Sequence, residues 1–85
     1  MTKMRAKVRV SGVFPMQNDK GEVTQERLMF HGVAKSGGYP QDGADEDNTF
    51  AKFSPSVSMD FLVANPALFG QFKPGDTFYV DFTPA

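Results

Sequence analysis

Alternating apolar and polar positions mark the first predicted strand of this sequence. Between Lys3 and Val13 nearly every second residue is apolar, and most of the residues between them are basic. A period of two places these two sets on opposite faces of a β-strand. The pattern predicts a strand over residues 3–13 with one buried and one basic face. Pro15 and the turn-forming residues 18–21 then predict its end and a hairpin.

Four further segments have the pattern or composition of strands. They are residues 23–34, 49–53, 57–63 and 77–83. The segment 23–34 is expected to be buried on both faces near its middle. Asn65 followed by Pro66 predicts one short helical turn, and residues 73–76 predict a type II turn. The sequence thus predicts an all-β fold, a small five-stranded antiparallel barrel or sandwich with one short helical turn before the last strand.

Residues 36–48 interrupt the alternation with a long polar loop. This stretch holds three glycines, one proline and four acids, with almost nothing apolar to bury. Loops of this length without internal structure are uncommon in a compact domain unless they are functional or mobile. We therefore expect residues 1–85 to form a single β domain with a long surface loop. This loop is the first candidate for an interaction site.

Length and composition narrow the classes of protein that remain. A chain of 85 residues has room for one domain, and 40% hydrophobic with 22% charged residues is typical of a globular protein. The absence of cysteine excludes disulfides and thiolate chemistry. No apolar run reaches membrane-spanning length and no signal-peptide pattern opens the sequence, so a cytoplasmic protein without a membrane partner is expected.

Residues suited to catalysis are few and scattered. His31 is the single histidine, and in mid-strand a structural imidazole is expected rather than a catalytic base. Asp60 and Asp81 lie on the outward faces of predicted strands, where a solubilising role is expected unless the strands pair. No phosphate-binding glycine pattern is present. We therefore expect a protein that is not an enzyme, with no catalytic residue, no cofactor and no metal site.

Acidic residues concentrate in the long loop. Four of the ten lie between positions 42 and 47: Asp42, Asp45, Glu46 and Asp47. Their oxygens suit Ca²⁺ or Mg²⁺, but the spacing of an EF-hand is absent. Weak divalent-ion binding, protein recognition and a merely solvated loop all remain open. As candidate protein-binding residues we select these four acids together with Tyr39.

Basic residues concentrate in the first predicted strand. Four of the nine lie on its outward face: Lys3, Arg5, Lys7 and Arg9. Their spacing of about 6.6–7 Å is close to the repeat of an extended phosphate backbone, and single-strand binders add stacking aromatic rings to such a row. Lys52, Phe50 and Phe53 complete this candidate nucleic-acid site, with Tyr39 as a further ring. The opposing interpretation is that basic side chains on an edge strand prevent aggregation. A net charge of −1 also does not favour nucleic-acid binding.

Three short motifs stand out in the C-terminal half. They are the aromatic-x-Lys-aromatic-Ser-Pro pattern of residues 50–55, the Asn65-Pro66-Ala67 turn, and an ending that runs from Pro74-Gly75-Asp76 to Phe82. In these motifs, and in the basic first strand, the chain resembles small proteins encoded by tailed bacteriophages and prophages. The resemblance covers most of the chain apart from the loop at 36–48. It implies a β fold and a place in the cytoplasm of the host bacterium, and it carries no activity and no site residue with it.

Two functions of different classes follow from these features. The first is a non-enzymatic bacteriophage accessory protein that binds a host or phage protein, or further copies of itself. Inhibitors of host factors or defence complexes and small virion or assembly components belong to this class. The alternative is a single-stranded nucleic-acid-binding protein with an OB-like barrel.

Overall fold

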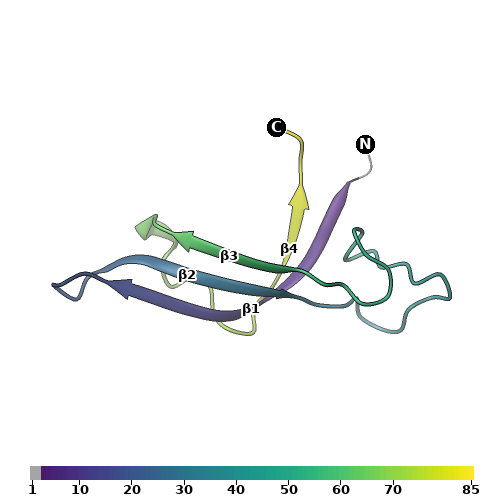
Figure 1. The fold of residues 1–85 in the computed structure, drawn as a ribbon, viewed down its shortest axis with the longest axis horizontal. Coiled ribbons are helices and arrows are strands. Elements are labelled where there is room, and N and C mark those ends of the chain that lie inside the picture. Colours follow the sequence, from purple (N-terminus) through teal and green to yellow (C-terminus); the bar gives the residue numbers. More distant parts are fainter. Residues whose placement is uncertain (1–2) are drawn as a thin grey trace.

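The computed structural model describes residues 3–85 as one four-stranded antiparallel sheet with one short 3-10 turn (Figure 1). In chain order the elements are β1 (Met4–Gln17), β2 (Val23–Gly32), β3 (Ser58–Val63), η1 (Pro66–Leu68) and β4 (Thr77–Phe82). Across the sheet the strands follow the order β3-β2-β1-β4. The prediction of a mostly β protein with a helical turn before the last strand is therefore confirmed.

The sheet is open, so the predicted barrel or sandwich is not confirmed. In the described residues β3 and β4 are the two edges of the sheet and do not pair with each other. Strand β4 pairs with residues 4–9 of β1, whereas β2 pairs with residues 8–17. The N-terminal part of β1 and β4 rise together from the rest of the sheet (Figure 1). The sheet is thus bent but does not close on itself.

The prediction of a fifth strand at residues 49–53 is wrong. This part of the described chain consists of turns and one isolated bridge. The Thr49 N–H donates to the Arg5 carbonyl at 3.0 Å, and Thr49 Oγ1 accepts the Arg5 N–H at 2.8 Å. Phe53 has a φ of +62°, which an extended strand does not allow. Local bonding to β1 therefore takes the place of a regular strand.

Strand β1 is longer than predicted and continues past Val13 to Gln17. Pro15 fits inside it because β4 does not reach this part of β1, so one side of the strand needs no N–H donor. The hairpin turn lies where it was predicted. There the Gly21 N–H donates to the Asn18 carbonyl at 3.0 Å, and Gly21 has a φ of +78°.

One face of the sheet, which we call the inner face, holds a small core. Its buried apolar side chains are Ala6, Val8, Val10, Leu28 and Phe30. On the opposite, outer face Met29 is 38% exposed and His31 is exposed as well. The segment 23–34, which contains β2, was expected to be buried on both faces near its middle. This expectation is wrong, because the described chain forms a single sheet that leaves the outer face to solvent.

The segment from residue 64 to 76 covers part of the inner face. Asn65 Oδ1 accepts the Ala67 N–H at 3.1 Å and so begins η1 as predicted. Beyond η1, the Phe72 ring packs against Phe30 with 6.2 Å between centroids. The turn at 73–76 also forms as predicted, with the Asp76 N–H donating to the Lys73 carbonyl at 3.0 Å.

The molecule is elongated and thin. It measures 56 × 29 × 16 Å and has a radius of gyration of 15.7 Å. A compact chain of this length has a radius of gyration of about 12 Å. In the described part of the chain, the second layer that normally covers a sheet is represented only by the short segment at 64–76.

Candidate functional site

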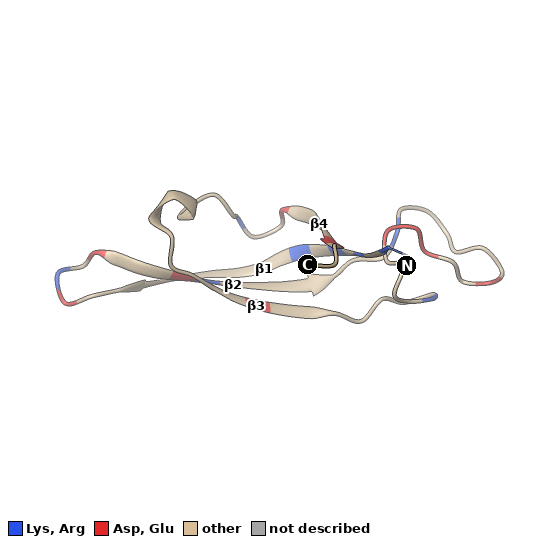
Figure 2. Ribbon diagram, turned by 90° about the horizontal axis from the view of Figure 1, so that it is seen from above, with Lys and Arg blue, Asp and Glu red and all other residues tan. Residues whose placement is uncertain are grey.

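The basic face of β1 and the acidic loop, which were predicted as separate binding sites, meet in the structure. Arg5 Nε lies 2.7 Å from Asp81 Oδ1, and Lys7 Nζ lies 3.3 Å from Asp47 Oδ2. Figure 2 shows basic segments of β1 next to an acidic segment of β4. Two of the cations proposed for phosphate binding are therefore already paired with carboxylates of the same chain.

Tyr79 connects these two ion pairs. Its hydroxyl donates to Asp47 Oδ1 at 2.9 Å, and the Arg5 guanidinium lies 4.4 Å from the centre of its ring. The bond to Asp47, with burial, raises the pKa of the Tyr79 hydroxyl, and the bond from Arg5 lowers the pKa of the Asp81 carboxyl. Tyr79 was not among the predicted site residues. Its outward position between Phe78 and Val80 is the sequence signal that would have pointed to it. In the structure it is in register with Lys7.

The other members of the predicted nucleic-acid site remain accessible. Lys3, Arg9 and Lys52 are exposed. Phe50 is 38% and Phe53 51% exposed. A ligand would therefore meet fewer unpaired cations than the sequence indicated, spread over β1 and the turns after the loop.

Asn48 fixes the long loop to the sheet. Its side chain is fully buried. Its Oδ1 accepts the Lys7 N–H at 2.8 Å, and its Nδ2 donates to the Val33 carbonyl at 2.8 Å and to Asp45 Oδ2 at 3.2 Å. These bonds satisfy backbone groups of β1 and of the residue after β2, which buried backbone requires. Asn48 is thus the structural centre of a loop that was predicted from its polarity alone.

Asp45, selected as a protein-binding residue, is only 5% exposed. Its Oδ1 accepts the N–H groups of Asp47 and Asn48, each at 3.0 Å, and its Oδ2 accepts the Tyr39 hydroxyl at 3.4 Å. Burial by itself raises the pKa of this carboxyl. The bonds from the Asn48 side chain and from the backbone outweigh burial, so the pKa lies below its usual value. Asp45 therefore shapes the loop from inside.

Acid is expected to destabilise the protein through Asp45. A carboxyl with a lower pKa in the folded chain adds stability above its unfolded pKa of about 3.9, and this stability is lost as the pH falls through the folded value. Asp60 and Asp81 are shifted in the same direction. The free energy of unfolding in urea should therefore fall between about pH 5 and pH 3, and less steeply in Asp45→Asn. The exposed Asp42→Asn is the control and should keep the wild-type slope; equal slopes in wild type and Asp45→Asn would contradict the assignment.

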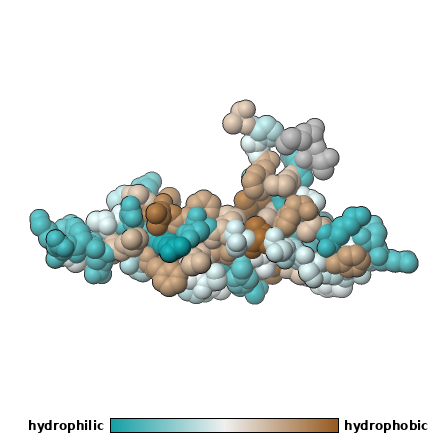
Figure 3. Space-filling model, viewed as in Figure 1, coloured by the Kyte–Doolittle hydropathy of each residue, from teal (hydrophilic) through white to brown (hydrophobic). Residues whose placement is uncertain are grey.

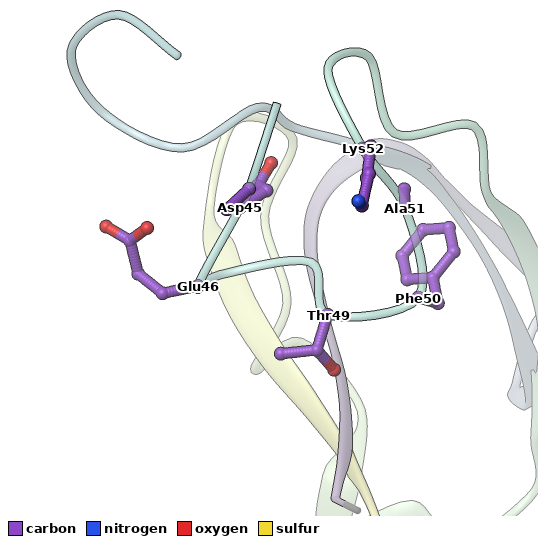
Figure 4. A pocket seen from close by; sticks show the side chains of 7 residues that line it. Asp45, Glu46, Thr49, Phe50, Ala51 and Lys52 are labelled. Atoms are coloured by element: carbon purple, nitrogen blue, oxygen red, sulfur yellow. The ribbon is translucent and has the colours of Figure 1, made fainter. Parts of the chain in front are cut away.

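Asp42 and Glu46 are the acids of the loop that face solvent. Asp42 Oδ1 accepts the Ala44 N–H at 3.1 Å. The Glu46 side chain is 73% exposed and lies 3.7 Å from Lys35 Nζ. It borders a shallow hollow of about 460 Å³ and points away from Asp45 (Figure 4). The loop thus presents two accessible acids to a partner.

Tyr39 of the loop packs against Phe53, which lies beyond the end of the loop. Their ring centroids are 5.8 Å apart, in an edge contact. The Phe53 ring also lies over Gly43, where a Cβ atom would collide with it. Burial is the main cause that raises the pKa of the Tyr39 hydroxyl, with Asp45 adding to it. These two rings therefore support the loop, and each has part of its surface occupied.

An apolar groove between the edge strands β3 and β4 was not among the predicted sites. It has a volume of about 430 Å³ on the inner face. Figure 3 shows apolar side chains gathered over the middle of the molecule, with hydrophilic residues at both ends. Its lining includes Phe30, Phe61, Leu68, Phe72, Phe78 and Val80.

Phe30 lies at the floor of this groove. Its ring makes edge contacts with Phe61, Phe72 and Phe78 at centroid distances of 5.9, 6.2 and 6.4 Å. Phe61 on β3 is 49% exposed and Phe78 on β4 is 37% exposed. Both side chains lie on the inner face, where Phe61 is in register with Leu28 and Phe78 with Val8. They remain exposed because the two edge strands reach the same ring without closing over it.

Glu26 is a buried carboxylate on the inner face, 4% exposed. Its Oε2 accepts the Gly70 N–H at 3.1 Å, which ties the residues after η1 to β2. Its Oε1 has no hydrogen-bond partner among residues 3–85. Glu26 shares the inner face with Leu28, so the period of two was the signal that it points inward.

The structure does not bring Asp60 and Asp81 together. Asp60 and Asp81 lie on opposite edge strands, and each is paired with an arginine, Arg27 and Arg5 respectively. Within this range no group of three or more histidines or acids is placed to hold a metal ion. The described part of the chain also has no helix of the length and apolarity needed to cross a membrane. No family model, curated protein or solved structure matches this chain.

Proposed function

We propose that this chain is a non-enzymatic bacteriophage accessory protein that acts by binding protein, and that the groove between β3 and β4 is its binding surface. The observation that carries the proposal is the cluster of half-exposed phenylalanines in the groove. Contiguous apolar patches on soluble proteins commonly mark interaction sites. The phage setting rests on the sequence motifs at 50–55 and 74–82, and either a host-factor inhibitor or a small virion component fits it.

The groove is a better candidate than the acidic loop. Asp45 and Asp47 are engaged in internal bonds, to the loop backbone and to Lys7. If these carboxylates bound a partner, their internal bonds would have to break. The free energy lost with those bonds would offset the free energy gained from the partner. Asp42 and Glu46 are the two loop residues that fit a role as accessory contacts.

Single-stranded nucleic-acid binding is the weaker alternative. An incoming phosphate would compete with Asp81 for Arg5 and with Asp47 for Lys7, at distances of 2.7 and 3.3 Å. Tyr79 offers a ring on this face, but the Arg5 guanidinium already lies over it. The electrostatic attraction that dominates such binding is correspondingly reduced.

Site-specific photo-crosslinking in bacterial cells tests the proposed function. A benzoylphenylalanine at position 68, in the groove and 41% exposed in the native leucine, should form covalent adducts with protein that mass spectrometry identifies. The same group at Ser58, on the outer face of β3, is the matched control and should give few adducts. If the adduct yield at position 68 were no higher than the yield at position 58, in infected cells and in uninfected cells alike, a binding role for the groove would be contradicted.

A further inference from the structure

The chain exposes more surface than a folded monomer of its size. Its accessible area is 5999 Å² at a mass of 9.4 kDa. A globular monomer of that mass exposes about 5,000 Å². The excess is similar to the roughly 800 Å² that each partner buries in a stable protein interface. The surplus is thus large enough to supply one side of a complete interface.

Much of the exposed apolar area lies on the inner face. Phe61 and Phe82 are 49% and 50% exposed, Leu68 41% and Phe78 37%. They come from both edge strands and from η1, and the rings of Phe61 and Phe78 contact the buried ring of Phe30. Stable domains normally cover such a face with a second layer. Here a face with aromatic side chains along both edges lacks most of that layer.

The outer face is a less suitable surface for a partner. It has exposed apolar residues of its own, Phe14, Met16 and Leu62, at 52%, 46% and 60%. The ion pair of Arg27 with Asp60 lies among them. Covering this pair would require the removal of water from two charges, whereas the groove has one charged lining residue, Asp81, which is bonded to Arg5 at its rim.

We infer that the groove is occupied by a second copy of this chain, with the two inner faces packed together about a two-fold axis. This inference rests on the proposed function and names the partner. A two-fold interface brings the same patch of each subunit together, so an apolar groove whose one charged lining residue, Asp81, is paired with Arg5 is complementary to itself. The net charge of −1 adds little repulsion between copies. A layer needed to complete the core must be present whenever the chain is made, and an identical chain meets that condition.

Such a dimer is a sandwich built from two chains. Two sheets that pack face to face lie about 10 Å apart, and each would supply the layer that the other lacks. The rings of Phe61 and Phe78 would lose their contact with water, while η1 and Leu68 would border the interface. The two-layer architecture expected from the alternation of the sequence would then be formed between molecules.

The solution mass of the purified chain tests this inference. Light scattering after gel filtration, at about 1 to 100 µM, should give twice the 9.4 kDa chain mass. Phe61→Asp and Leu68→Asp place a carboxylate in the interface and should weaken the dimer at least about 30-fold. Leu62→Asp is the matched control, because Leu62 is adjacent in β3 and lies on the outer face; it should leave the dimer intact. Leu68 is on an exposed turn, so its variant is decisive if Phe61→Asp fails to fold by circular dichroism.

Three outcomes would overturn the second copy as occupant. They are a monomer mass over the whole concentration range, a folded Leu68→Asp that dimerises like wild type, and a dimer lost in Leu62→Asp alone. A monomer that still forms crosslinks to another protein from position 68 refutes the dimer and retains the proposed function. A monomer without such crosslinks refutes both.

Discussion

Phe30→Ala is expected to lower the free energy of unfolding by about 3–5 kcal/mol. Phe30 is 7% exposed and contacts rings from β3, from the segment after η1 and from β4. Its removal leaves a cavity where these three parts of the chain meet. Because a domain of this length has a total stability of only about 4–13 kcal/mol, the variant should lose a large share of its total stability.

Equilibrium unfolding in urea, followed by circular dichroism, measures this loss. All variants are compared at one protein concentration, because dimerisation adds concentration-dependent stability. Met29→Ala is the matched control, since Met29 is the preceding residue and is 38% exposed on the outer face. It should cost less than about 1 kcal/mol. Similar losses in the two variants would mean that Phe30 is not the centre of the core.

Asn48→Ala is expected to lower the free energy of unfolding by about 2–4 kcal/mol. The substitution removes the bonds to the Lys7 N–H, the Val33 carbonyl and Asp45. Two part-buried backbone groups then lose their partner, which costs more than the loss of a solvent-exposed bond. The loop should detach from β1, and amide hydrogen exchange of residue 7 should accelerate along with the loss of stability.

The control for Asn48→Ala is Gln41→Ala. Gln41 is an amide side chain in the same loop, but it is exposed. Its replacement should change the free energy of unfolding by less than about 0.5 kcal/mol. If Asn48→Ala left both stability and exchange at residue 7 unchanged, the loop would not depend on this side chain.

The sequence predicted the turns of this fold well. Gly21 and Gly75 both adopt the positive φ that their turns require, and Asn65 begins η1 with its side chain. These features depend on residues that are neighbours in the chain, and their chemistry is the same in any fold. For the same reason the alternation in β1 and β3 correctly identified which side chains share a face.

The charged sites were predicted less well than the turns. Lys7 and Asp47 are 40 residues apart, and the sequence assigned them to different binding sites. Their ion pair depends on how the loop returns to β1, which is set by Asn48 and Thr49. The return of the loop to β1 also explains why residues 49–53 do not form a strand. A count of charges along the chain carries no information about such pairing.

The sequence by itself determined that the chain is mostly β, where it turns, and which side chains of β1, β3 and β4 point toward the core. Only the tertiary structure decided that four strands form, that β3 and β4 are separate edges, and that the phenylalanines between them lie in an open groove. The physical reason is the range of the interactions. Side-chain alternation and turn geometry are local properties of the backbone, whereas closure of a sheet depends on pairing and register between distant segments.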